Sequence, residues 1–248
     1  MSPVSSPRAA VILAAGNGDR FKNADHHSKL LHPVAGQPLI IRTLQTAAAA
    51  GVSSFCVVVG FEADRVRGLV EAHQPPGVNV EFVYNPDWHL ENGLSALAAR
   101  EYCGDRRFAL LMGDHLFEAA VLQRLLDLDV GASDSVLAVD SLPANPDIAA
   151  EATRVRMKAG RVTAIGKDVE PWDALDTGMF VFSPALFDAL EEARAAGQTT
   201  LSAGVQRLAA RGLMLGADVA GAAWCDVDTM ADLDAAETLL TRAEPEPA

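Results

Sequence analysis

An apolar run near the start of the chain, Ala9–Leu13, leads into a turn that contains Gly16 and Gly18, and two basic residues follow at Arg20 and Lys29. Glycines let backbone N–H groups turn and approach a ligand closely, while Arg and Lys supply positive charge. This combination is typical of a strand that delivers a polyphosphate-binding loop. We therefore predict that a nucleoside triphosphate binds here.

Two familiar phosphate-binding motifs do not match this sequence. A P-loop needs glycine, four residues and then Gly-Lys-Ser/Thr, a string that the chain lacks. The dinucleotide fingerprint needs a third glycine or alanine three residues after the second, and that position is Phe21. An ordinary strand-to-loop turn would explain the glycines alone, so the downstream basic pair is what favours phosphate binding.

Two acidic segments, far apart in the sequence, could hold a metal ion beside those phosphates. Asp114 comes just after the apolar run Phe108–Met112, and alternation puts Asp226 and Asp228 on one face of an extended segment. Mg²⁺ usually takes one or two carboxylates plus phosphate oxygens. We predict that Asp114 and Asp228 bind Mg²⁺ and leave open whether Asp226 joins them. Turn formation by Asp114 and helix capping by Asp228 are the structural alternatives.

Carboxylates around one Mg²⁺ suit the transfer of a nucleotidyl group. An acceptor attacks the α-phosphorus, and the metal neutralises charge on the leaving pyrophosphate, so no covalent nucleophile is required. Lys167 follows a glycine at the end of an apolar run and leads toward the polar turn that begins at Asp176. A phosphorylated polyol could bind at these two places.

A polar turn at a predicted helix start offers groups for the nucleobase, namely Asn92, Gly93 and Ser95. Helix capping is an equal rival for these residues.

The histidines give no comparable metal site. Their loop spacing at His26, His27 and His32 matches no compact set of ligands. We expect His115 to point away from its neighbour Asp114 and to have a structural role.

The elements that must position these residues alternate apolar runs with helical patterns in the first half. The predicted strands are Ala9–Ala14, Phe55–Val59, Asn79–Tyr84 and Phe108–Met112. One predicted helix begins at Pro38 and stops at Gly51, and two others span Glu62–His73 and Leu94–Tyr102. This order favours right-handed βαβ units and a parallel sheet. Ligands bind beyond the carboxyl ends of such strands, which would bring the glycine turn and Asp114 to one crevice.

The second half has short strands joined by tight turns, and then helices. The predicted strands are Ser135–Val139, Arg154–Met157, Val162–Ile165 and Leu175–Phe182. The predicted helices start at Pro184, at a Ser202 cap and at a Thr229 cap, and they run to about Ala196, Arg211 and Thr241. We predict an α/β, Rossmann-like fold with a mainly parallel mixed sheet, flanking helices and an antiparallel acceptor-binding part. One domain spans 8–241, with a nucleotide-binding half (8–130), an acceptor-binding half (131–241) and flexible tails at 1–7 and 242–248.

The composition excludes several other classes. The 248 residues carry 33 Asp plus Glu against 20 Lys plus Arg, a formal charge of −13, which disfavours a broad nucleic-acid or anionic-membrane surface. The three cysteines are dispersed and suggest reduced thiols rather than disulfides or zinc ligands. The sequence shows neither a signal-peptide pattern nor an apolar stretch long enough to span a membrane. We expect a cytoplasmic protein without stable membrane insertion, and the sequence allows a homo-oligomer.

The chain resembles the sugar-phosphate nucleotidyltransferases over about residues 8 to 240. The resemblance starts in the opening strand, glycine turn, Arg20 and Lys29. Within that superfamily the chain looks most like the inositol-1-phosphate cytidylyltransferases, on the segments Met112–His115, Glu151–Arg156, Gly160–Val162, Ile165–Asp168, Asp176–Phe180 and Trp224–Thr229. The resemblance implies a GT-A-like fold and the Mg²⁺-dependent formation of CDP-inositol from CTP and inositol 1-phosphate.

The resemblance also implies a role for each matching residue. Arg20 and Lys29 would hold the phosphates, Asp114 and Asp228 the Mg²⁺, and Lys167 the acceptor phosphate. The residues that would line the nucleotide are Leu13, Ala14, Gly16, Asn17 and Gly18, and those that would bind acceptor hydroxyls are Glu151 and Asp176.

Two positions depart from the superfamily pattern. Asp19 stands where a threonine is frequent, and Ser28 stands where a proline often precedes the lysine. Lipid-making relatives are in some cases fused to a membrane synthase, so a separate downstream synthase is the partner implied here.

Other functions remain open on the sequence. Another nucleotidyltransferase would use phosphocholine, a phosphonate or a sugar 1-phosphate as acceptor. A choline pocket would need an aromatic cage, for which the chain offers only two tyrosines and three tryptophans. A glycosyltransferase of similar architecture would consume a nucleotide sugar. A catalytically inactive sensor would bind CTP without turnover.

Overall fold

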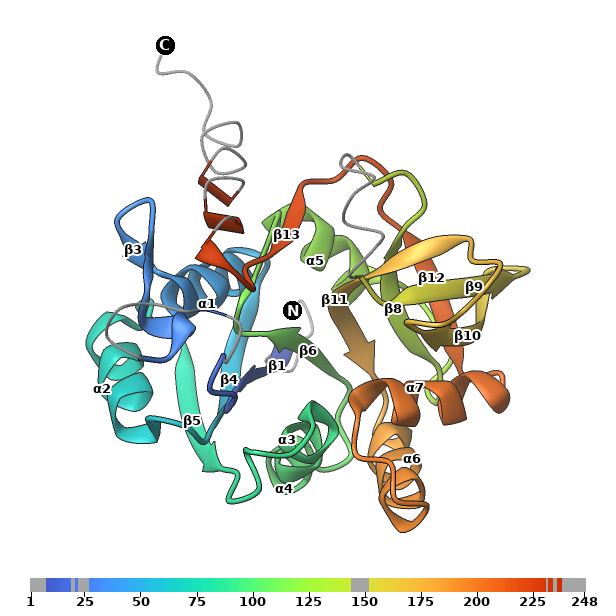
Figure 1. The fold of residues 1–248 in the computed structure, drawn as a ribbon, viewed down its shortest axis with the longest axis horizontal. Coiled ribbons are helices and arrows are strands. Elements are labelled where there is room, and N and C mark those ends of the chain that lie inside the picture. The colour runs from blue at the N-terminus through green and yellow to red at the C-terminus, as the bar shows by residue number, and fades with distance from the viewer. Residues whose placement is uncertain are drawn as a thin grey trace, which may run out of the picture.

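The chain forms a mixed β-sheet with helices on both faces (Figure 1). The computed structural model describes residues 8–18, 21, 27–143, 152–230, 232–233 and 236–237. Its strands are β1 (Arg8–Ala14), β4 (Val52–Val59), β5 (Asn79–Tyr84), β6 (Phe108–Met112), β8 (Ser135–Asp140), β9 (Arg154–Lys158), β10 (Arg161–Gly166), β11 (Ala174–Phe182) and β12 (Met214–Asp218). They lie in the order β5-β4-β1-β6-β11-β8-β12-β10-β9. Two small ribbons pair β2 (Pro33–Val34) with β3 (Gln37–Pro38), and β7 (His115–Phe117) with β13 (Trp224–Asp226).

The helices enclose a separate apolar core on each face of the sheet. They are α1 (Leu39–Ala49), α2 (Ala63–His73), α3 (Asn92–Ala98), α4 (Arg100–Cys103), α5 (Ala119–Asp127), α6 (Ala185–Ala195) and α7 (Leu201–Ala210), with a 3₁₀ turn η1 at Lys29–Leu31. Side chains of α1, α2 and α5 pack into one core, and side chains of α3, α4, α6 and α7 into the other. Within the described segments no helix is both long and apolar enough to cross a membrane.

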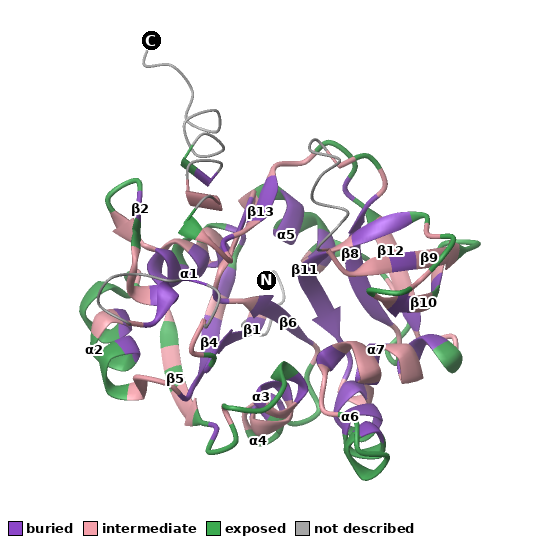
Figure 2. Cartoon of the chain, viewed as in Figure 1, coloured by how far each residue is buried: buried purple, intermediate pink, exposed green. Residues whose placement is uncertain are grey.

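The sheet changes from parallel to antiparallel at β11. Strands β5, β4, β1 and β6 are parallel, whereas β11 is antiparallel to both β6 and β8. Strands β1 and β6 are almost wholly buried, as Figure 2 shows in purple, which explains their continuous apolar runs. Leu13 and Met112 are register partners near the ends of these strands. Consequently the loops that follow β1 and β6 leave the sheet side by side.

The corner after β6 is tightly held. Gly113 donates its N–H to the carbonyl of Leu13 at 3.0 Å, and a Cβ on Gly113 would come within 2.9 Å of that oxygen. The buried hydroxyl of Thr43, on α1, lies 3.2 Å from the carbonyl oxygens of Gly113 and His115. These contacts fix the backbone on both sides of Asp114.

The prediction of a mixed α/β sheet with flanking helices is confirmed, and β5 and β6 have the predicted bounds. Strand β12 was not predicted; its short apolar run is interrupted by Gly216, and most of its residues are half-buried. The helix predicted over Leu94–Tyr102 is two helices, α3 and α4, which meet at Ala99.

Several predicted helix starts are wrong. Glu62 has φ +50° and caps α2, which begins at Ala63. Pro38 is extended, with φ −56° and ψ 140°, so that α1 begins only at Leu39. Thr200, and not Ser202, caps α7, because its side chain accepts a hydrogen bond from the N–H of Ala203. Most of the third helix, predicted to run from Thr229 to Thr241, lies outside the described residues.

Candidate active site

A cleft of about 360 Å³ opens beyond the carboxyl ends of β1 and β6. Its lining residues are Leu13, Ala14, Gly16, Asn17, Gly18, Lys29, Leu30, Glu91, Asp114 and Asp228. A volume of this size lies in the range of small-molecule sites. The cleft therefore brings together the glycine turn, the downstream lysine and the two carboxylates that the sequence singled out.

Lys29 lies between the two carboxylates. Its Nζ is 2.7 Å from Asp114 Oδ2 and 2.6 Å from Asp228 Oδ1, and only 9% of its side chain is exposed. Burial by itself lowers the pKa of a lysine, but Asp114, Asp226 and Asp228 raise the pKa of Lys29 above its usual value. The ammonium group is thus charged and offsets several carboxylates at once.

The acidic side chains reach this point from two distant segments. Asp114 lies in the turn between β6 and β7, and Asp228 follows β13 by two residues. The antiparallel ribbon of β7 and β13 pairs His115 with Asp226, and the N–H of Val227 donates to the carbonyl of Asp114 at 3.1 Å. The ribbon therefore fixes both acidic segments beside Lys29.

Gly18 shapes the other side of Lys29. Its φ of +66° is a conformation that favours glycine, and a Cβ there would lie 3.1 Å from Lys29 Cγ. Gly16 has open space where a Cβ would stand. The glycine turn thus covers the aliphatic stem of Lys29 and leaves room for a ligand over Gly16.

His115 does not point away from Asp114, contrary to our prediction. Its Nδ1 lies 3.0 Å from Asp114 Oδ1. The prediction applied strand alternation to the pair, but Asp114 belongs to the turn before β7, where alternation does not hold. Burial opposes charge on the ring, yet Asp226, Asp114 and Asp176 raise the pKa of His115 to about 9.

The carboxyl groups around this imidazole titrate differently. Burial opposes ionisation of Asp114, but Lys29 and His115 hold its pKa well below the usual value. Burial raises the pKa of Asp226 to about 7; His115 opposes the rise, while Asp114 and Asp228 add to it. The cluster therefore combines a firmly ionised Asp114 with an Asp226 whose pKa lies well above the usual value of an aspartate.

The donor set fits a hard divalent cation. Carboxylate oxygens of Asp114 and Asp228 already surround one positive charge, and Asp226 Oδ1 is buried without a hydrogen-bond partner among the described residues. One oxygen each of Asp114 and Asp226 lies within 4.8 Å of a ring nitrogen of His115. Because Nδ1 of His115 already contacts Asp114 Oδ1, His115 acts here as a partner that orients this carboxylate.

Asp176 lies half-buried beside the same imidazole. Its Oδ1 accepts the N–H of Gly178 at 2.8 Å, and burial raises its pKa to about 6 against the opposing effects of that bond and of His115. Gly178 has φ +75°, and a Cβ there would stand 2.7 Å from His115 Nε2. The ring of His115 therefore connects the corner at Asp114 with the turn at Asp176.

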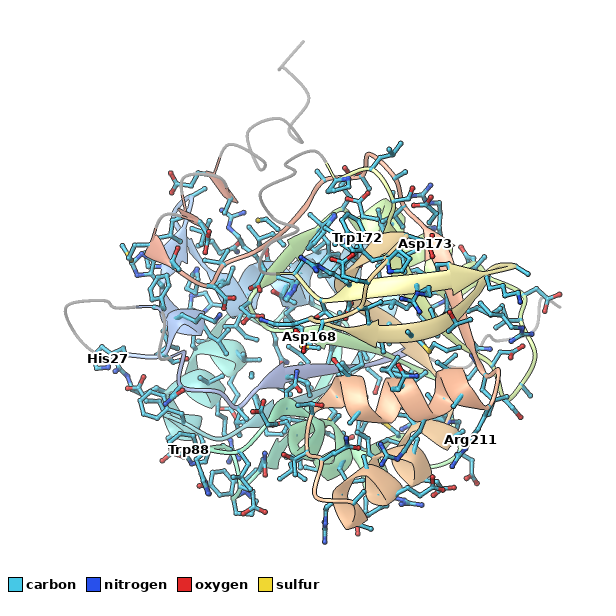
Figure 3. The ribbon with its side chains drawn as sticks, turned by 45° about the vertical axis from the view of Figure 1, so that its right-hand side comes forward. His27, Trp88, Asp168, Trp172, Asp173 and Arg211 are labelled. Atoms are coloured by element: carbon cyan, nitrogen blue, oxygen red, sulfur yellow. The ribbon has the colours of Figure 1, made fainter. Side chains whose placement is uncertain are left out.

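The structure places Lys167 outside the cleft lining and does not describe two other predicted site residues. Lys167 is exposed in the turn after β10, and Figure 3 shows its neighbour Asp168 near the middle of the view, below the yellow strands. Arg20 and Glu151 lie outside the described residues. The roles assigned to these residues stay predictions.

The turn predicted to read a base makes structural contacts. Asn92 Oδ1 accepts the N–H of Leu201, and Ser95 Oγ accepts a hydrogen bond from Asn85. A Cβ on Gly93 would stand 2.5 Å from the carbonyl oxygen of Thr199. The residue of this turn that lines the cleft is Glu91, which the sequence did not single out and whose only indication was its place in the turn. Base reading by Asn92, Gly93 and Ser95 stays a prediction.

Comparison with known proteins agrees with the site. The sequence model of the MobA-like NTP transferase domain matches residues 10–212. The bifunctional IPC transferase and DIPP synthase of Rubrobacter xylanophilus is 38% identical over 234 residues, which cover 93% of this chain and 51% of that protein. Its counterpart in Aquifex aeolicus is 34% identical over 239 residues, 94% and 52% of the two chains. The chain thus spans about half the length of these relatives.

A solved structure has the same fold. The inositol-1-phosphate CTP transferase from T. maritima superposes with a TM-score of 0.84 over 98% of both chains, at 22% identity. Together with the family match, this confirms the resemblance to nucleotidyltransferases that the sequence indicated.

The first prediction concerns the cation between the carboxylates. Replacing Lys29 by Met leaves buried carboxylates without their counter-charge, which costs on the order of 3 kcal/mol. We expect Lys29→Met to melt earlier in EDTA, and Mn²⁺ or Mg²⁺ to raise its melting temperature more than that of the wild type. Lys158→Met, which removes an exposed lysine, is the control for net charge. An equal metal response in Lys29→Met and the wild type would contradict this account.

The second prediction concerns pH. The pKa of Asp176 is about 6 in the folded protein against 3.8 ordinarily. Between these pH values the folded protein holds a proton that the unfolded chain has lost, so the free energy of unfolding of the wild type falls as pH rises from about 3.8 to about 6. Asp176→Asn can still accept the N–H of Gly178 and lacks this loss. Its melting temperature should match the wild type near pH 3.5, exceed it increasingly up to pH 6, and stay higher by roughly 3 °C or more above pH 6. Melting curves in EDTA with a pH-independent difference would refute this.

Proposed function

The chain belongs to the MobA-like NTP transferase domain family, and from this premise we propose that it transfers a cytidylyl group from CTP to inositol 1-phosphate. The products are CDP-inositol and pyrophosphate. The observation that carries the proposal is the buried Lys29 between Asp114 and Asp228, inside a cleft that the glycine turn also lines.

The named relatives support the choice of substrates. The curated relatives at 38% and 34% identity are IPC transferases fused to DIPP synthases, and the solved neighbour is an inositol-1-phosphate CTP transferase. This chain aligns with about half of each bifunctional relative, and we assign the transferase step to these residues. A synthase that consumes CDP-inositol is the downstream activity we infer.

The triphosphate would lie across the glycine turn. Open space over Gly16 leaves room for it, and Lys29 presents a charged ammonium with three donors at the base of the cleft. A phosphate oxygen competes with Asp114 and Asp228 for these donors. Lys29 would therefore exchange a carboxylate for the phosphates when CTP binds, and Arg20 would add a second positive charge.

The divalent cation, which we propose to be Mg²⁺, would be held by Asp114 and Asp228. When bound it supplies charge neutralisation on the triphosphate and on the departing pyrophosphate. His115 keeps Asp114 oriented through Oδ1, which leaves Oδ2 directed into the cleft toward Lys29. The buried Oδ1 of Asp226 is available to join the ligand set.

The acceptor would bind on the side of Asp176. We assign its phosphate to Lys167 and its hydroxyls to Asp176 and Glu151. The carboxyl group of Asp176 is held by the N–H of Gly178, and its second oxygen can accept from a hydroxyl. Orientation of the acceptor phosphate toward the α-phosphorus accounts for catalysis without a covalent intermediate.

The test of this function is pyrophosphate release by the purified protein with Mg²⁺, each of the four NTPs, and one of three acceptors: inositol 1-phosphate, glucose 1-phosphate or phosphocholine. We expect release with CTP and inositol 1-phosphate. Release with another pair would retain the chemistry and replace the substrates. No release with any pair, together with CTP binding, would indicate a sensor instead of an enzyme.

The third prediction concerns the two carboxylates. Asp114→Asn and Asp228→Asn each remove charge next to the triphosphate while preserving side-chain shape. Each should lower the rate by about a hundredfold or more. Asp188→Asn changes an exposed carboxylate on α6 by the same chemistry and should leave the rate unchanged. Turnover near the wild-type rate in either site variant would remove that residue from the mechanism.

A further inference from the structure

The residue before Lys29 has an unusual environment for a serine. Ser28 is only 1% exposed, its φ is −52° and its ψ is 130°. Proline fixes φ at about −65 ± 15°, a range that includes this value. The backbone before Lys29 is therefore held in a conformation that a proline ring would enforce, although the chain has no proline here.

A carboxylate from a distant element holds this conformation. Glu62 Oε2 accepts the N–H of Ser28 at 2.7 Å, and Glu62 Oε1 accepts a hydrogen bond from Arg65 at 2.7 Å. His27 Nδ1 lies 2.9 Å from the same Oε1. Burial opposes the charge of Glu62, but the Ser28 N–H, Arg65 and His27 lower its pKa. Glu62 is thus ionised, and its carboxylate accepts a hydrogen bond from the residue before Lys29.

Glu62 is itself rigidly placed. It has φ +50° and ψ 35° at the cap of α2, and the preceding N–H, of Phe61, donates to the carbonyl of Ala15 at 2.9 Å. At Gly60 an added Cβ would stand 2.3 Å from Trp88 Cβ. In Figure 3, His27 and Trp88 lie toward the left of the view. The corner after β4 therefore touches the glycine turn at Ala15 and the lysine segment at Ser28.

We propose that Glu62 is a positioning residue for nucleotidyl transfer, whose hydrogen bond to the Ser28 N–H replaces a proline ring and directs Lys29 into the cleft. The turn η1 begins at Lys29, and its backbone bonds run from Leu31 N–H to Ser28 O and from His32 N–H to Lys29 O, each at 3.0 Å. Rotation of Ser28 would break the first bond and move Lys29 away from Asp114 and Asp228. Glu62 therefore acts on the phosphates only through Lys29.

The proposal distinguishes Glu62→Ala from Glu62→Gln, from Arg65→Ala and from a double variant. Glu62→Gln keeps an oxygen acceptor for Ser28, and Arg65→Ala removes one of the two partners of Oε1 while leaving Oε2 in place. Ser28→Pro alone would place ring carbons against the Glu62 carboxylate, because the N–H it replaces lies 2.7 Å from Oε2. The double variant Glu62→Ala/Ser28→Pro removes that conflict and fixes φ covalently.

The first readout is hydrogen exchange without nucleotide, which reports η1 independently of the proposed function. Amides of Leu31 and His32 should exchange at least about tenfold faster in Glu62→Ala than in the wild type. They should remain protected in Glu62→Gln, Arg65→Ala and the double variant. Unchanged exchange in Glu62→Ala, or equal acceleration in the double variant, would overturn the proposal.

The second readout is kinetic and rests on the proposed function. Glu62→Ala should raise KM for CTP about tenfold, with KM for the acceptor and kcat within about threefold, and the double variant should restore KM for CTP. A parallel change in both KM values would indicate general destabilisation and contradict a positioning role. If the wild type turns over no substrate while the exchange pattern holds, the proposed function fails and the Glu62–Ser28 contact stands.

Discussion

The ion pairs of Lys29 with Asp114 and Asp228 are the interaction on which the rest of the site depends. They join segments separated by 85 and 199 positions at a point where little water reaches the lysine. Without the ammonium group, two carboxylates and the neighbouring Asp226 would face one another in a buried corner, an arrangement that is costly unless a cation intervenes. A site that must hold a cation in every state is well suited to exchange one for another.

The fold builds this corner from rigid parts. The parallel pair β1–β6 delivers the glycine turn and Asp114 side by side, and Thr43 on α1 secures the backbone around Asp114. The β7–β13 ribbon then returns the last acidic segment to the same place. With a net charge of −13, the protein as a whole repels a triphosphate. We therefore expect the attraction to come from Lys29 and Arg20, with a bound divalent cation offsetting the neighbouring carboxylates.

The sequence alone predicted the parallel half of the sheet and the glycine turn, because buried strands and glycine turns have local patterns. It also singled out Lys29, Asp114 and Asp228, which the structure brings together in one cleft. It did not predict the contact of His115 with Asp114, since that depends on where a turn replaces a strand. The contact of Glu62 with Ser28 and the place of Glu91 in the cleft lining depend on the tertiary fold, and no local pattern marks them. Strand β12 was missed because Gly216 interrupts its short apolar run and its pairing with β8 is a tertiary contact.

The most direct test of the central claim is a crystal structure with CTP and Mn²⁺, read from the anomalous signal of the metal. The account predicts a Mn²⁺ peak at coordinating distance from Asp114 and Asp228, with the Lys29 ammonium bound to a phosphate oxygen. A bound CTP whose metal lies elsewhere, with Lys29 still bridging both carboxylates, would contradict it.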